Sequence, residues 1–328
     1  MFRIKTAYIV VDKYFHESSK CRNNLNSETI KAKARYVGVL LVLLSLYYLG
    51  DILFNNLGSL QGIDLTGRNI MILVLLLCFH FAANGISSYA WVLQLKRKYP
   101  GFGFPRAYAI TGLSQIGKYL PGNVGHYVAR MVLIPENVKK PDVAFTLFVE
   151  TLVMTFTAAG IGFFYIFYFD VFSEFGASRI GIIAIAGLFG LVAVSAGLRF
   201  LRTKYEFLSL QISDYLKVMC CFASIFLMGG FTILLLLSIY TNLESVTYFQ
   251  CVTGFALSFM AGFIIPGAPG GIGIREFAFV LLFGDFVSEV VALEAILVFR
   301  VINVIGDILL FGVAFMLNKK ITGRLISE

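Results

Sequence analysis

Two glycine-rich segments are the part of this sequence best suited to bind a ligand. Pro121-Gly122-Asn123-Val124-Gly125 and Pro269-Gly270-Gly271-Ile272-Gly273 share one pattern, and each interrupts an otherwise apolar stretch. Missing side chains let the backbone approach a ligand closely. A helix that begins after such a break presents unpaired N–H groups, which favour anions. The pattern therefore predicts anion binding at helices that begin near Gly125 and Gly273.

Basic side chains near the two breaks fit the same chemistry. Lys118, His126 and Arg130 flank the first break, and Arg275 follows the second. Arg300 lies roughly 15 Å into the last apolar helix, at 1.5 Å per residue, and an ionisable residue at that depth indicates function. The residues predicted to bind substrate are Lys118, Pro121, Gly122, Asn123, Gly125, Arg130, Gly270, Gly271, Gly273, Arg275 and Arg300.

Two carboxylates and one face of the last helix are predicted to act in coupling or gating. Glu150 and Glu276 are the candidate counter-charges of the arginines. Arg300, Asn303 and Asp307 have the i, i+3, i+7 spacing of residues on one helix face. The coupling or gating residues are therefore predicted to be Glu150, Glu276, Asn303 and Asp307.

Structural roles remain open alternatives for several of these charges. Arg300 can pair with Glu150 or Asp307 simply to hold helices together, as buried charges in membranes often do. Lys118 and Arg130 can instead extend their charged ends to the cytoplasmic interface. The two Pro-Gly breaks can be kinks without a ligand.

The remaining polar residues indicate no enzyme chemistry. Among the histidines, His126 fits a polar turn residue with a lesser chance of touching substrate, and His80 fits an interhelical donor better than a proton relay. The histidines and five cysteines lack metal-ligand spacing, and no catalytic triad, phosphate loop or dinucleotide fingerprint is present. We therefore expect a protein that is not an enzyme and has no metal or cofactor.

The composition is that of a polytopic membrane protein. Hydrophobic residues make up 58% and charged residues 14% of the 328 residues, against roughly 25% charged in soluble domains. The net charge of +8 comes from lysines and arginines at the ends of apolar runs, so we expect no nucleic-acid binding. Trp91 is expected to anchor at the membrane interface. The predicted spanning helices are Tyr36–Phe54, Ile70–Leu95, Val143–Phe169, Ile180–Leu198, Val218–Tyr240 and Val290–Leu317.

The basic clusters fall on one side of the membrane only if both broken segments turn back within it. Ala107–Pro135 must then enter from the cytoplasm, and Val246–Asp285 from the opposite face. This predicts an all-α fold of about six spanning helices and two oppositely oriented broken re-entrant hairpins, an inverted repeat. The alternative is that Val246–Ile265 crosses and the C-terminus lies outside, against the charge of Lys319 and Lys320.

The same pattern divides the chain into three parts. Residues 1–35 are expected to be a cytoplasmic N-terminal segment, residues 36–318 one transmembrane domain, and residues 319–328 a cytoplasmic tail.

These motifs resemble those of the lysylphosphatidylglycerol synthase transmembrane family, the flippase-like module of the multiple peptide resistance factor. The resemblance rests on Gly117–Gly125 with Arg130, on Glu150, on Pro269–Glu276 and on Arg300. It implies a lipid translocase fold in a bacterial or archaeal cytoplasmic membrane. Only four residues follow Arg324, so the soluble aminoacyl-transferase domain of the resistance factors is expected to be absent.

The resemblance and the residues together predict a function and its rivals. The preferred prediction is flipping of an anionic lipid or lipid-linked saccharide, with the headgroup held at the two helix N-termini and the buried arginines. One alternative is a non-transporting accessory subunit that binds a membrane glycosyltransferase or synthase. Another is a transferase acting on a polyprenyl phosphate, which the sequence disfavours because it lacks an acid–base cluster. Oligomerisation stays open.

Overall fold

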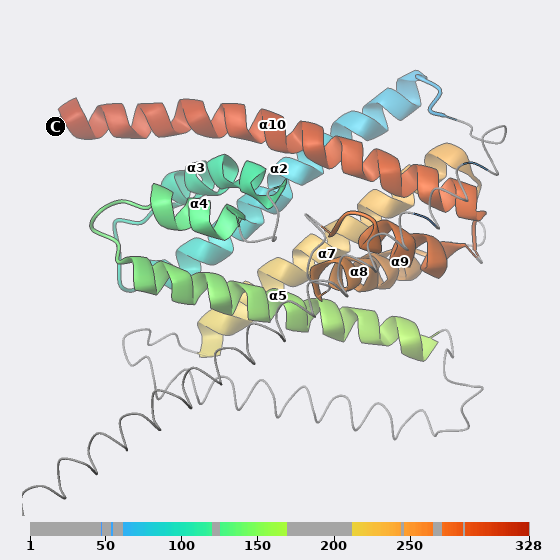
Figure 1. The fold of residues 1–328 in the computed structure, drawn as a ribbon, viewed down its shortest axis with the longest axis horizontal. Coiled ribbons are helices and arrows are strands. Elements are labelled where there is room, and N and C mark those ends of the chain that lie inside the picture. The colour runs from blue at the N-terminus through green and yellow to red at the C-terminus, as the bar shows by residue number, and fades with distance from the viewer. Residues whose placement is uncertain are drawn as a thin grey trace, which may run out of the picture.

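The computed structural model describes residues 62–119, 125–168, 212–243, 246–264, 271–284 and 286–327, with Tyr47 and Phe54. Within these residues every regular element is a helix (Figure 1). Most of the predicted span Tyr36–Phe54 and all of Ile180–Leu198 lie outside the described residues, as do residues 120–124 and 265–270 at the two breaks.

Four long helices make this an all-α polytopic membrane protein, as predicted. Each is long and apolar enough to cross a bilayer. Their bounds differ from prediction at the ends. The helix predicted from Ile70 begins at Gly67, three residues earlier, because the Thr66 hydroxyl accepts a hydrogen bond from the Asn69 N–H and caps the helix. The four helices are α2 (Gly67–Leu95), α5 (Lys140–Tyr168), α7 (Ile212–Tyr240) and α10 (Glu289–Ser327).

The two segments with Pro-Gly breaks form shorter helices. The first contains α3 (Phe104–Ser114), the 3₁₀ helix η2 (Gln115–Tyr119) and α4 (Gly125–Leu133). The second contains α8 (Tyr248–Ile264) and α9 (Ile274–Phe283). At 1.5 Å per residue, α3, α4 and α9 are roughly 14–17 Å long, about half of the hydrocarbon core, and α8 is at the lower limit of a span. These lengths suit the predicted re-entrant hairpins.

A glycine contact closes each of these segments in the same way. A Cβ on Gly117 would lie 2.7 Å from the backbone of Gly125 and His126. A Cβ on Gly271, which has φ +72°, would lie 3.0–3.2 Å from the backbone of Gly262. In each segment, the incoming and returning chains therefore touch backbone to backbone beside the break, which a larger side chain would prevent. The two segments are built alike, as an internal repeat requires.

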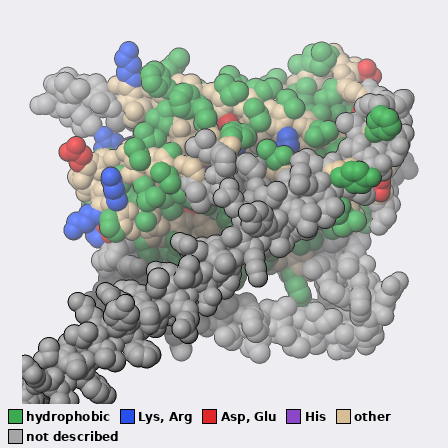
Figure 2. Space-filling model, viewed as in Figure 1, with side chains coloured by type: hydrophobic (Ala, Val, Ile, Leu, Met, Phe, Trp, Pro, Cys, Tyr) green, Lys and Arg blue, Asp and Glu red, His purple; other side chains and the backbone are tan. Residues whose placement is uncertain are grey.

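The long helices enclose the broken segments. The helix α10 runs along α3, where Gly112 lies against Leu310 and Ala314, and α8 packs between α5 and α7 (Figure 1). Apolar side chains cover most of the described surface in view, and lysine and arginine side chains gather toward one end (Figure 2). Such a surface suits lipid contact along the sides and water at the ends.

The end of α2 is held by ion pairs rather than by an aromatic anchor. The Arg97 Nε lies 2.8 Å from the Asp214 carboxylate on α7, and the Lys98 Nζ lies 2.5 Å from the Asp142 carboxylate on α5. Tyr99 also donates its hydroxyl to Asp142. Burial and this hydrogen bond raise the pKa of Tyr99. The basic cluster that marks the membrane boundary therefore also joins three helices.

The expectation that Trp91 anchors at the interface is wrong. Its side chain is fully buried, and its indole N–H donates to the Thr146 hydroxyl on α5 at 3.0 Å. The edge of its ring meets Phe102, with 5.1 Å between ring centroids. The chain after α2 folds back over Trp91, which turns a helix-end tryptophan into a core residue.

Two glycines in long helices allow a matched test of this packing. A Cβ on Gly230 of α7 would lie 2.4–2.7 Å from Val252 of α8, whereas one on Gly160 of α5 meets nothing within 4 Å. Alanine favours a helix over glycine by about 1 kcal/mol at both sites, but overpacking costs about 1–3 kcal/mol. We expect Gly230→Ala to lower the melting temperature in detergent and Gly160→Ala to keep or raise it. Equal effects would contradict the close contact of α7 and α8.

Cysteine labelling tests the re-entrant topology. In a cysteine-free background, Lys96→Cys and Asn137→Cys flank the first broken segment, and Asn242→Cys and Ser288→Cys flank the second. We expect an impermeant maleimide to label the first pair from the cytoplasmic face only and the second pair from the opposite face only. Labelling of the two members of a pair from opposite faces would show that the segment crosses.

Candidate functional site

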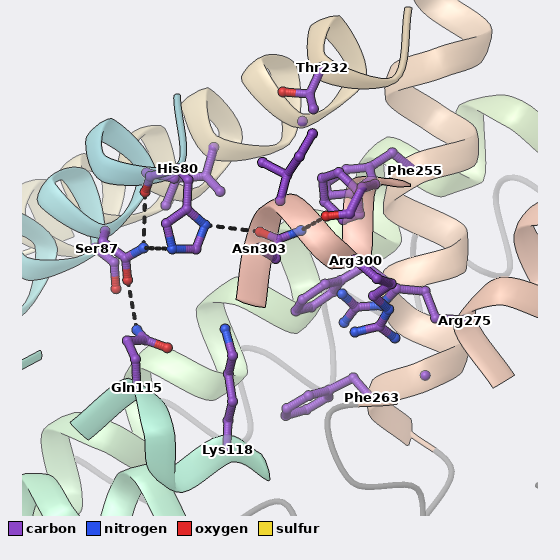
Figure 3. Close-up of a pocket in the computed structure, with 18 of the residues that line it drawn as sticks. His80, Ser87, Gln115, Lys118, Thr232, Phe255, Phe263, Arg275, Arg300 and Asn303 are labelled. Atoms are coloured by element: carbon purple, nitrogen blue, oxygen red, sulfur yellow. Dashed lines mark hydrogen bonds between the residues drawn. The ribbon is translucent and has the colours of Figure 1, made fainter. Parts of the chain in front are cut away.

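A cavity of about 710 Å³ lies between the two broken segments. The first segment contributes Lys118 and Arg130 to its wall, and the second contributes Arg275 and Glu276. Lys118 and Arg275 approach the cavity from different elements (Figure 3). A wall of aromatic residues from α7 and α8 faces these charges: Phe222, Phe226, Phe255, Phe259 and Phe263. The cavity is thus charged on one part of its surface and apolar on another.

Most predicted site residues in the described part of the chain meet at this cavity. Gly125, Gly271 and Asp307 lie directly behind the wall, in contact with residues of the two segments or with Lys118. Pro121, Gly122, Asn123 and Gly270 fall outside the described residues. The predicted residues that line the cavity are Lys118, Arg130, Glu150, Gly273, Arg275, Glu276, Arg300 and Asn303.

Arg130 and Glu150 form a buried ion pair between α4 and α5. The Arg130 Nη1 lies 3.0 Å from the Glu150 Oε2, and Ser87 of α2 donates to Oε1 at 3.2 Å. The guanidinium lies 5.2 Å from the ring centre of Trp91. Because the Arg130 residue is only 3% exposed, it does not extend to the membrane interface.

Lys118 is held by Asp307 of α10. The Lys118 Nζ lies 2.5 Å from the Asp307 Oδ2, and the Tyr119 hydroxyl donates to the same oxygen at 2.6 Å. Asp307 is completely buried. Lys118 therefore also turns inward, where it joins η2 of the first broken segment to the last helix instead of reaching the interface.

Glu276 makes two contacts at the start of α9. Its Oε2 accepts a hydrogen bond from the Gly273 N–H at 2.7 Å, and its Oε1 accepts one from the Arg300 Nε. Arg300 therefore pairs with Glu276, and not with Glu150 or Asp307 as the structural alternative supposed. One N–H at the N-terminus of α9 is already occupied by the helix's own carboxylate, so this helix end is less open to an anion than the sequence suggested.

Arg275 differs from the other cations of the cavity. Its guanidinium carbon lies 4.6 Å from the ring centre of Phe259, and its buried Nε has no hydrogen-bond partner. Within the described residues, no carboxylate lies within ion-pair distance of it. Arg275 and Arg300 point toward the same part of the cavity (Figure 3). A cation with an aromatic face and no counter-charge is suited to receive an anion.

The charges at the cavity do not balance. Among the described residues, the cations are Lys118, Arg130, Arg275 and Arg300, and their carboxylate neighbours are Glu150, Glu276 and Asp307. The undescribed residues at the two breaks, 120–124 and 265–270, are all uncharged types. With neutral histidines, the described residues of the site hold four cations and three carboxylates. This balance favours an anionic ligand over a cationic one.

Fold and cavity together define a multi-pass helical membrane protein with a polar site enclosed by its helices. The family model for the lysylphosphatidylglycerol synthase TM region matches residues 35–310, so the chain belongs to this family. The matched region is the membrane part of the synthase, and the catalytic transferase is a separate portion. No curated protein matches the chain.

Sequence reasoning missed a polar network beside the cavity. The His80 Nδ1 of α2 donates to the Asn303 Oδ1 of α10 at 2.9 Å, which fits the expected role as an interhelical donor. Asn84, one helical turn later, lies 3.2 Å from the His80 Nε2, and Gln115 of the first segment donates to Asn84 at 2.7 Å. The i, i+4 spacing of a histidine and an asparagine inside an apolar helix is the signal that would have found it.

The buried pair Arg130–Glu150 allows a test by single and double substitution. Removal of one partner leaves an uncompensated buried charge, which costs about 3–5 kcal/mol, while removal of both is close to neutral. We expect Arg130→Met and Glu150→Gln each to lower the melting temperature in detergent strongly. The double variant should regain most of the loss. A double variant as unstable as the sum of the two would contradict the pairing.

Proposed function

We propose that this protein moves the headgroup of an anionic lipid or a lipid-linked saccharide from one face of the membrane to the other. The single observation that carries the proposal is the cavity between the two broken segments, where the described residues hold one more cation than carboxylates and none of their carboxylates forms an ion pair with Arg275. Family membership supports a flippase-like role, because the matched module is a membrane region with that association.

The charge of the site favours a particular headgroup. A phosphodiester carries one negative charge, which would neutralise the excess positive charge of the cavity. Its oxygens would accept hydrogen bonds from Arg275 first and then from Arg300 and Lys118. Bidentate arginine contacts to phosphate are among the stronger charge-assisted hydrogen bonds. The acyl or prenyl tails would stay in the bilayer, beside the aromatic wall from α7 and α8.

The carboxylates give the site a way to release its cargo. Glu276 pairs with Arg300, and Asp307 pairs with Lys118. A bound phosphate would compete for both cations, and the carboxylates would take them back when it leaves. In this proposal, rocking of the two broken segments against each other opens the cavity first to one face and then to the other.

The orientation follows from the positive charges. We infer that the protein lies in the cytoplasmic membrane of a bacterium or archaeon, with both termini in the cytoplasm. Glu150, Glu276, Asn303 and Asp307 act in gating, and the substrate-binding role predicted for Pro121, Gly122, Asn123 and Gly270 rests on the sequence alone.

Reconstitution tests this function. Purified protein is placed in liposomes with a fluorescent phosphatidylglycerol, and dithionite reports the fraction of headgroups on the outer face. Each lost hydrogen bond to a charged group costs about 1.5–3 kcal/mol, so we expect Arg275→Ala with Arg300→Ala to slow flipping at least tenfold. Arg97→Ala is the matched control, because Arg97 pairs with Asp214 at the end of α2 and does not line the cavity.

Two outcomes would contradict the proposal. An unchanged rate in the double variant would show that these arginines do not hold the headgroup. No flipping by the wild-type protein, together with stable co-purification of a membrane glycosyltransferase or synthase, would favour an accessory subunit.

A further inference from the structure

We propose that His80 binds a proton inside the membrane domain and that this proton is taken up together with the anion. In the proposal, the His80 Nε2 accepts a hydrogen bond from Asn84 when the ring is neutral and donates one to Asp307 when it is protonated. The proton site stands on the network alone, and the link to the anion rests on the proposed function.

The network assigns the proton on the other ring nitrogen. Asn303 donates its amide Nδ2 to the Phe299 carbonyl at 2.8 Å, which turns its Oδ1 toward His80. The distance from that oxygen to the His80 Nδ1 is 2.9 Å. Since an amide oxygen only accepts, Nδ1 must carry hydrogen. Whether the ring is neutral or protonated therefore depends on whether Nε2 carries a proton.

Asn84 supplies the first partner of the His80 Nε2. Asn84 donates its Nδ2 to the His80 carbonyl at 2.9 Å, and the same amide nitrogen lies 3.2 Å from the His80 Nε2. Gln115 donates to the Asn84 Oδ1 at 2.7 Å, which fixes the direction of the Asn84 amide. In a neutral ring, Nε2 would accept this hydrogen bond from Asn84.

Asp307 supplies the second partner of Nε2. The Asp307 Oδ1 lies 3.1 Å from the His80 Nε2. Asp307 is completely buried, and this oxygen has no hydrogen-bond partner among the described residues. A buried acceptor without a donor costs free energy, and a proton on Nε2 would supply the donor. One nitrogen cannot accept from Asn84 and donate to Asp307 at once, so the two bonds define two states.

The last helix is shaped to hold the ring at this place. A Cβ on Gly306 would lie 2.5 Å from the His80 Cδ2. The glycine lies between Asn303 and Asp307 in the sequence, so the imidazole rests against the backbone of α10 between its two partners. A larger residue would push the ring away from both.

The charged groups around His80 make its protonation depend on the cavity. Lys118 and Tyr119 of η2 hold the other Asp307 oxygen, and Arg275 of α9 and Arg300 of α10 lie within electrostatic range of Lys118. These cations oppose a further positive charge.

The other elements around His80 add little charge. On α4 and α5, Arg130 and Glu150 compensate each other, and His126 faces the cavity. The described residues of α7 and α8 that line the cavity are uncharged.

An anion at Arg275 and Arg300 would remove the opposition to a proton. It would offset their positive charge, and by drawing Lys118 away it would leave Asp307 in need of another donor. Both effects favour protonated His80. By linkage, a proton on His80 must favour the anion equally. The loaded site would then hold one phosphodiester and one proton together.

Nitrogen NMR of ¹⁵N-histidine-labelled protein tests the proton site without any ligand. The His80 signals are those lost in His80→Gln, and their shifts report whether Nε2 is protonated. At one fixed pH near 6.5 we expect Asp307→Asn to decrease the protonated fraction and Asn84→Ala to increase it. A ring whose Nε2 shows no change between pH 5 and 8, or that responds to neither variant, would overturn the proposal.

Calorimetry tests the link to the anion. Dioctanoyl phosphatidylglycerol is titrated into the protein in two buffers of different ionisation enthalpy, and the difference gives the protons bound per lipid. We expect net proton uptake in the wild type and in the control Arg97→Ala, which does not line the cavity, and none in His80→Gln that still binds lipid. Binding without proton uptake in the wild type would refute the coupling and leave flipping intact. Absence of binding would refute the proposed function and the coupling, while the NMR result still decides the proton site.

Discussion

The structure depends on the need to compensate every charge buried in a low-dielectric interior. Moving an isolated ion out of water costs several kcal/mol, and the attraction of a buried partner with good geometry offsets that penalty. Arg130 forms an ion pair with Glu150, Lys118 with Asp307, and Arg300 with Glu276. Each pair joins different elements, so charge compensation also sets how the broken segments sit among the long helices. Arg275 is the exception in the described part of the chain, and an exception to such a rule indicates function.

Glycines supply the second constraint. A bilayer has no water to satisfy a broken backbone, so an interrupted helix must be enclosed by protein or face a polar cavity. Gly117 against Gly125, and Gly262 against Gly271, bring the two chains of each segment together. The close approach lets short helices with charged residues reach the interior while long apolar helices face lipid. Both segments thus use a glycine contact beside the break, although the contacting positions differ.

Sequence reasoning predicted the class and most of the candidate site for a definable reason. Hydropathy and the Lys and Arg bias act locally, so the four long helices were found, with ends that differ from prediction by up to ten residues. The Pro-Gly breaks and the buried arginines were found because both are costly in a membrane. Trp91 was placed wrongly because its neighbours, Phe102 and Thr146, come from other elements. The network of His80, Asn84 and Gln115 was missed because each of these residues is unremarkable alone.

By itself, the sequence determined which residues are apolar enough to span a bilayer, where the backbone must break, and how many charges the interior must hold. These features follow from residue type and order, because the bilayer favours or disfavours each side chain and each unpaired backbone group locally. Only the tertiary structure decided which carboxylate compensates which cation, because residues far apart in the chain must first be brought together. Glu276 therefore pairs with Arg300 and caps its own helix, Asp307 pairs with Lys118 and faces His80, and Arg275 pairs with no carboxylate among the described residues.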